Sequence, residues 1–163
     1  MKLRLLLVCL LLVSAPLQAG DAVNPRLSRL LAAAQPPEGV VFEIIAWEDN
    51  TWDWAAPMLR EQVDRLRARY PRLAVALVSH GAELFDLVVS SALRDGPAIR
   101  ELEHLSTEGV DIHVCGQYAS WKRLGPRDFP EFVDVAASGS AQLADYIDLG
   151  FEHIRLERPH ATD

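Results

Sequence analysis

The sequence predicts an α/β domain with a mostly parallel five-stranded sheet and helices on both faces. Short apolar runs rich in β-branched residues alternate along the chain with segments of helical periodicity. One run, LAVALVSHG at residues 73–81, is apolar on both faces, which is typical of a parallel strand covered by helices on each side. Strands that alternate with helices form right-handed βαβ units, and 163 residues suit one such domain.

Five runs have the composition and length of strands. They are expected at residues 40–47, 73–81, 110–115, 132–137 and 151–156, the last as an edge strand. Helical segments are expected between them and before them, at residues 24–34, 56–70, 82–91, 98–107, 118–124 and 141–149. Asn24-Pro25 is a cap followed by proline, Pro71 stops the second helix, and Gly109 caps the helix before the third strand. The stretch EDNTWDW at residues 48–54 is expected to be a polar, aromatic loop.

The first residues have the pattern of a secretory signal. A basic start with Lys2 and Arg4 precedes an apolar run at residues 5–13, and small residues end at Ala19, where cleavage is expected. The expected layout is a signal peptide at 1–19, a helical appendage and linker at 20–39, the α/β domain at 40–157 and a polar tail at 158–163. Export predicts a periplasmic protein with no membrane association after cleavage. Cys9 would leave with the signal.

The net charge disfavours two classes of partner. The formal net charge is −7, and without Lys2 and Arg4 the remaining 14 basic and 23 acidic residues give −9. Nucleic acids and anionic membrane surfaces are bound through clustered Lys and Arg, so neither is expected as a partner of this acidic chain.

Chemistry is expected at the carboxyl edge of the sheet, where ligands gather in this class of fold. The third strand delivers Cys115, the one thiol of the mature chain, and the second delivers His80. A thiol at the start of a helix or turn, near an imidazole, favours the reactive thiolate. We therefore expect Cys115 and His80 to be catalytic. The residues expected to line a ligand site there are Trp47, Glu48, Trp54, Gly81, Gly116, Tyr118 and Gly139.

Each of these assignments has a structural alternative. Cys115 could be a small buried apolar residue, and His80 could cap its turn through a backbone hydrogen bond. Glu48 and Asp49 could act as paired carboxylates, or they could simply belong to a solvated acidic loop. Three tryptophans could line a pocket or form a subunit contact, namely Trp52, Trp54 and Trp121. His113 and Cys115 share a face of one strand, but no second close pair of ligands is visible, so no metal and no cofactor are expected.

Four segments together resemble the DsrE-like family. They are SHG at residues 79–81, GVDIHVCG at 109–116, RDFPEFVDVAASG at 127–139 and LGFEHIRL at 149–156. The resemblance covers about residues 40–156. It implies a compact α/β domain that assembles into trimers or hexamers, and a cysteine after the third core strand that accepts and passes on a persulfide. Cys115 matches that cysteine, and His80 matches the histidine of the strand-two HG pattern.

The resemblance implies a carrier of sulfane sulfur on Cys115, with a sulfur donor or acceptor protein and further copies of itself as partners, and the signal pattern predicts that this carrier is exported. The alternative is a non-catalytic ligand-binding or assembly module in which Cys115 is structural. A third reading is an intermolecular disulfide through Cys115.

Overall fold

The computed structural model describes residues 24–91, 93 and 95–158. The expected signal peptide and Cys9 lie outside this range, as does most of the expected polar tail. In the part of the chain that is described, no helix combines the length and apolar character needed to cross a bilayer.

The sheet has five parallel strands in the order β4-β3-β2-β1-β5. Their bounds are β1 Gly39–Ile44, β2 Ala74–Ser79, β3 Val110–Cys115, β4 Asp134–Ala136 and β5 Phe151–Arg155. The last strand along the chain therefore pairs with the first, and β5 is an edge strand as predicted. All five carboxyl ends lie at one edge of the sheet.

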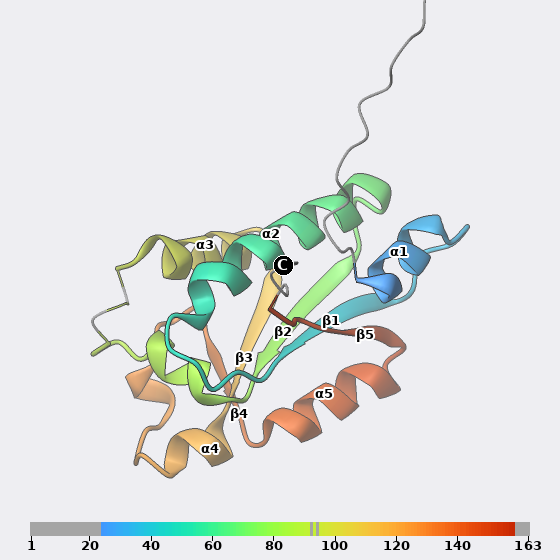
Figure 1. Cartoon of the computed structure of the whole chain (residues 1–163). Coiled ribbons are helices and arrows are strands. Elements are labelled where there is room, and N and C mark those ends of the chain that lie inside the picture. Colours follow the sequence, from blue (N-terminus) through green and yellow to red (C-terminus); the bar gives the residue numbers. More distant parts are fainter. Residues whose placement is uncertain (1–23, 92, 94, 159–163) are drawn as a thin grey trace, which may run out of the picture.

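Helices cover both faces of this sheet, as Figure 1 shows. The α-helices are α1 Pro25–Ala32, α2 Thr51–Arg69, α3 Pro97–Thr107, α4 Gly116–Ser120 and α5 Gly139–Asp148, and two 3₁₀ helices span η1 Ala82–Leu87 and η2 Pro126–Asp128. Helices α1, α2 and α3 lie on one face, and α5 packs across β1, β2 and β3 on the other. The predicted fold class is confirmed.

The two faces of the sheet are unequal. The larger core lies under α2 and α3 and holds most of the fully buried large side chains, such as Phe42, Leu59 and Leu77. Each such side chain stabilises the fold by roughly 1.5–3 kcal/mol. The cluster under α5 contains only four buried residues, Val41, Ala76, Val78 and Tyr146. The small apolar layer on this side leaves room for the buried carboxylate of Glu43.

One predicted loop is helical. Helix α2 begins at Thr51, five residues before the predicted start at residue 56, so most of the segment after Asp49 is not a loop. Trp52 is buried in the larger core, and its Nε1 donates a hydrogen bond to the backbone oxygen of Glu83 at 2.9 Å. Burial of this indole with its N–H satisfied outweighs the low helix propensity of the Asn, Thr and Asp residues around it.

Candidate functional site

Cys115 lies where β3 ends and α4 begins. Its Sγ accepts a hydrogen bond from the backbone N–H of Tyr118 at 3.4 Å. The backbone N–H thus supplies the sulfur, which is a weak acceptor, with one hydrogen-bond donor. The residue is only 7% exposed and packs with the larger core. The thiol is therefore at the predicted edge of the sheet, but it is more enclosed than the sequence reading assumed.

Gly139, the first residue of α5, lies close to both Cys115 and His80. A Cβ at Gly139 would lie 2.5 Å from the Cβ of His80 and 3.2 Å from the Cβ of Cys115. Real side chains do not tolerate the first of these distances, so α5 can begin here only because residue 139 is glycine. The structure thus places three of the predicted site residues together.

The two other predicted glycines also allow close backbone approach. A Cβ at Gly81 would lie 2.5 Å from the backbone N of Ala46, and one at Gly116 would lie 2.7 Å from the backbone O of Ala136. Each glycine therefore lets the loop after one strand lie directly against the end of its neighbour.

A buried carboxylate that the sequence reading missed bridges two histidines on the α5 side of the sheet. Glu43 of β1 is 7% exposed. Its Oε1 lies 2.9 Å from His80 Nε2, and its Oε2 lies 3.0 Å from Nε2 of His153 on β5. We call these three residues the Glu43 bridge. A single acid inside the apolar run VVFEIIA was the sequence signal that could have revealed it.

A second buried carboxylate, Glu83, ties together the loops that follow β1 and β2. It is 1% exposed and accepts hydrogen bonds from the N–H of Ala46 at 2.8 Å, the N–H of Gly81 at 2.9 Å and the hydroxyl of Ser79 at 2.8 Å. Burial raises the pKa of Glu83, although these hydrogen bonds act in the opposite direction. Glu83 fixes the backbone on both sides of His80.

Aromatic rings gather beside the thiol and around Tyr118. The ring of Tyr118 lies 5.8 Å from Trp47, 5.2 Å from Phe85 and 5.1 Å from Trp121, measured between centroids. Trp47 is 67% exposed and Trp121 is 74% exposed. We call these four residues the aromatic cluster. It contains two of the predicted ligand-site residues, Trp47 and Tyr118.

The other two predicted ligand-site residues are not part of the aromatic cluster. Trp54 is on α2, where its ring packs against the larger core rather than joining the aromatic cluster. Glu48 is exposed, and its Oε2 accepts a hydrogen bond from the N–H of Trp47 at 3.3 Å.

His113 is engaged with a tyrosine. Its Nε2 lies 2.8 Å from the hydroxyl of Tyr146 on α5. Burial lowers the pKa of His113, and burial together with Asp111 raises the pKa of Tyr146 to about 12. Among the described residues, no group of three or more His, Cys, Asp or Glu side chains is arranged to hold a metal ion.

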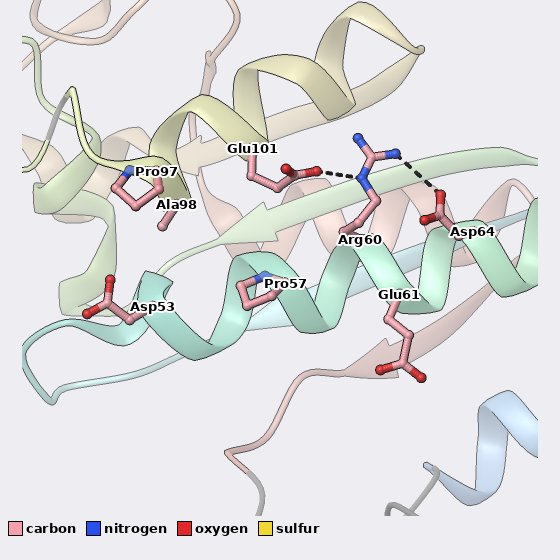
Figure 2. A pocket seen from close by; sticks show the side chains of 8 residues that line it. All are labelled: Asp53, Pro57, Arg60, Glu61, Asp64, Pro97, Ala98 and Glu101. Carbon is pink, nitrogen blue, oxygen red and sulfur yellow. Dashed lines mark hydrogen bonds and ion pairs between the residues drawn. The ribbon is translucent and has the colours of Figure 1, made fainter.

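A groove of about 500 Å³ lies on the other face of the sheet, between α2 and α3 (Figure 2). Its lining consists of Asp53, Pro57, Arg60, Glu61, Asp64, Pro97, Ala98 and Glu101. Arg60 closes one part of it, with its Nε 2.5 Å from Glu101 Oε1. None of the predicted site residues lines this groove, so size alone does not identify the functional site.

Comparison with solved structures agrees with the fold. No family model matches the chain, and no curated protein matches it. A protein of unknown function from Methanobacterium thermoautotrophicum, MTH1491, is 23% identical over 72% of this chain and 97% of its own, with a TM-score of 0.59. The ychN protein of E. coli is 13% identical over 73% of this chain and 99% of its own, with a TM-score of 0.55. This chain shares their fold. At these identities the likeness concerns the architecture alone, and the chemistry has to be argued from the residues.

Proposed function

We propose that this protein carries sulfane sulfur as a persulfide on Cys115, in the manner of the DsrE-like sulfur-relay proteins that its sequence resembles. The observation that carries the proposal is the position of Sγ at the carboxyl edge of a parallel sheet, with an N–H of α4 directed at it and His80 across Gly139. The backbone N–H supplies a hydrogen-bond donor for the sulfur, and the imidazole is a group that can take up its proton.

The chemistry requires only the thiol and its neighbours. Cys115 Sγ, as a thiolate, attacks the outer sulfur of a donor persulfide or polysulfide. A new S–S bond forms at Cys115, the S–S bond of the donor breaks, and the donor leaves as a thiolate with the electron pair. The proton given up by Cys115 passes to the imidazole of His80. An acceptor thiolate then attacks the outer sulfur and leaves Cys115 as a thiolate again, so the cycle is redox-neutral.

The setting of this activity is part of the proposal. The amino-terminal sequence supports export to the periplasm, and the resemblance supports a homotrimer or hexamer. The exposed indoles of Trp47 and Trp121 support a protein contact at the edge that holds the thiol, because large aromatic residues are enriched in interfaces. The contact would be made with another copy or with a donor or acceptor protein.

Intact-mass measurement tests the proposal. The purified protein, with its signal removed and its thiol reduced, is treated with polysulfide, desalted and weighed. The expected result is a gain of one sulfur atom that is removed by dithiothreitol and is absent in Cys115→Ser. No gain in wild-type protein, or the same gain in Cys115→Ser, would contradict the proposal.

The enclosure of Cys115 favours a second candidate, a ligand-binding or assembly module in which the cysteine is structural. A side chain that is 7% exposed and in contact with the larger core behaves as an ordinary small apolar residue in many proteins. The two candidates differ in accessibility of the thiol. Under native conditions, a carrier reacts with iodoacetamide within minutes, whereas a structural cysteine reacts only when denaturant is added.

A further inference from the structure

We infer that Glu43, held in place by His153, is a positioning residue that controls the charge of His80 and thereby regulates the reactivity of the Cys115 thiol. The inference rests on the proposed role of that thiol. It concerns two residues, Glu43 and His153, that lie far from Cys115 in the sequence. Four observations carry it.

The first observation is that the carboxylate of Glu43 is enclosed. At 7% exposure its charge is largely removed from water, which is costly unless hydrogen bonds replace the lost hydration. The two imidazoles supply these hydrogen bonds, at 2.9 and 3.0 Å, one to each oxygen. Because both oxygens have a donor, the carboxylate has one orientation, and the ring of His80 is held by it.

The second observation is the atom that His80 uses. In the arrangement that we infer, Glu43 is ionised and only accepts hydrogen bonds, and Nε2 of His80 and Nε2 of His153 carry the protons of the two contacts. In a neutral imidazole the lone pair is then on Nδ1. Glu43 therefore fixes His80 in the tautomer whose Nδ1 is available as a base.

The third observation is that His80 and Cys115 both border Gly139. The point where a Cβ of Gly139 would lie is 2.5 Å from the Cβ of His80, 2.9 Å from its Cγ and 3.2 Å from the Cβ of Cys115. The imidazole and the thiol thus flank the first residue of α5. A proton that moves from Cys115 to His80 creates an imidazolium beside a thiolate, and the negative charge of Glu43 stabilises that imidazolium.

The fourth observation is the arrangement of the other titratable groups on this face. Arg155 of β5 is paired in register with Glu43 but is exposed. His113 of β3 is bound to Tyr146 of α5, and Asp111 and Asp134 lie near these two. His80 and His153 are the histidines bound to Glu43, so the bridge can be perturbed separately from the His113–Tyr146 pair.

The test is the pH dependence of iodoacetamide alkylation at Cys115, measured by mass spectrometry on the full mature protein. Alkylation joins sulfur to carbon and releases iodide, so it reports the thiolate directly. In Glu43→Gln, the amide cannot stabilise the imidazolium as a carboxylate does. We expect the pH midpoint of the rate to rise by about one unit, which is the size of shift that a nearby charge produces, and the rate at neutral pH to fall about tenfold.

His113→Gln is the matched control, because it removes a histidine of the same face that does not contact Glu43. Its alkylation profile should coincide with that of wild-type protein. In a His80→Gln background, Glu43→Gln should cause no further shift, because Glu43 acts through His80. If Glu43→Gln fails to fold, Glu43→Asp keeps the charge with a shorter reach, and we expect a smaller rise of the midpoint.

Two results would overturn the inference. The first is an alkylation profile of Glu43→Gln that coincides with that of wild type, or such a profile of Glu43→Asp where that variant has to be used. The second is an equal shift of the pH midpoint by Glu43→Gln with and without His80. The sulfur-carrier proposal fails separately. In one outcome the wild-type protein takes up no sulfur while Glu43→Gln still shifts the alkylation profile. That pair of results would contradict the proposed function and support the control of the thiol by Glu43.

Discussion

Gly139 lies so close to His80 that a Cβ at position 139 would come within 2.5 Å of the histidine Cβ. Since the same position also borders Cys115, this glycine determines how closely α5 can approach the thiol. The absence of a Cβ at residue 139 is therefore a condition for the close packing of α5 against His80 and Cys115.

Gly139→Ala should therefore destabilise the protein and disturb the site. We expect a loss of about 1–3 kcal/mol in the free energy of unfolding, the usual cost of overpacking, together with a changed alkylation rate of Cys115. Urea denaturation measures the first effect. Gly125→Ala is the control, because a Cβ there meets nothing within 4 Å. Equal stability of the two variants would contradict the close packing at Gly139.

Glu83 should make stability fall as the pH rises. Its pKa is raised by burial, so the folded protein binds a proton more tightly than the unfolded chain. The contribution is fully present below the ordinary pKa of glutamate and is lost as the pH rises through the raised value of the folded state. Urea denaturation over a pH series should show this slope in wild-type protein and its absence in Glu83→Gln. If the free energy of unfolding has the same pH dependence in wild-type protein and in Glu83→Gln, the raised pKa of Glu83 is refuted.

His113 should make the stability of the protein fall as the pH falls. Its pKa is lowered by burial, so its contribution to stability is present above the ordinary pKa of histidine, about 6.5, and is lost as the pH falls through the lowered value. The melting temperature of wild-type protein should drop more steeply with acidification than that of His113→Gln. The measurement is scanning calorimetry in matched buffers, and identical acid slopes for the two proteins would count against a buried, neutral His113.

Trp121 should contribute to assembly if the aromatic cluster is an interface. Its indole is 74% exposed, and truncation of a tryptophan at the centre of an interface costs about 2 kcal/mol or more, roughly a thirtyfold loss of affinity. Trp121→Ser should shift the protein toward monomer in sedimentation velocity at low concentration. Leu149→Ser, which changes an apolar residue that is 66% exposed outside the cluster, should not.

Local patterns predicted the strands well and the helix starts less well. The third strand, residues 110–115, has the predicted bounds because Gly109, with φ of 84°, separates it sharply from α3. The start of α2 was wrong because Asn50, Thr51 and Asp53 are typical of turns. Only the tertiary burial of Trp52 makes that segment helical.

The candidate site was predictable only in part, for a geometric reason. The carboxyl ends of neighbouring parallel strands meet, so Cys115 and His80 could be placed together from the order of strands. Glu43 and His153 could not, because their contact depends on β5 pairing with β1 across 110 residues of sequence. Sequence patterns show which face a strand buries, but they do not show which strand lies beside it.

The pairing of β5 with β1 also has a temporal consequence. Synthesis runs from Glu43 toward His153, so a growing polypeptide contains Glu43, His80 and Cys115 well before His153, the second partner of Glu43, is made. Until that final strand docks, the acid has a single partner and the histidine beside the sulfur is not yet fixed. The complete set of contacts around Glu43 therefore forms only when the last strand has paired with the first.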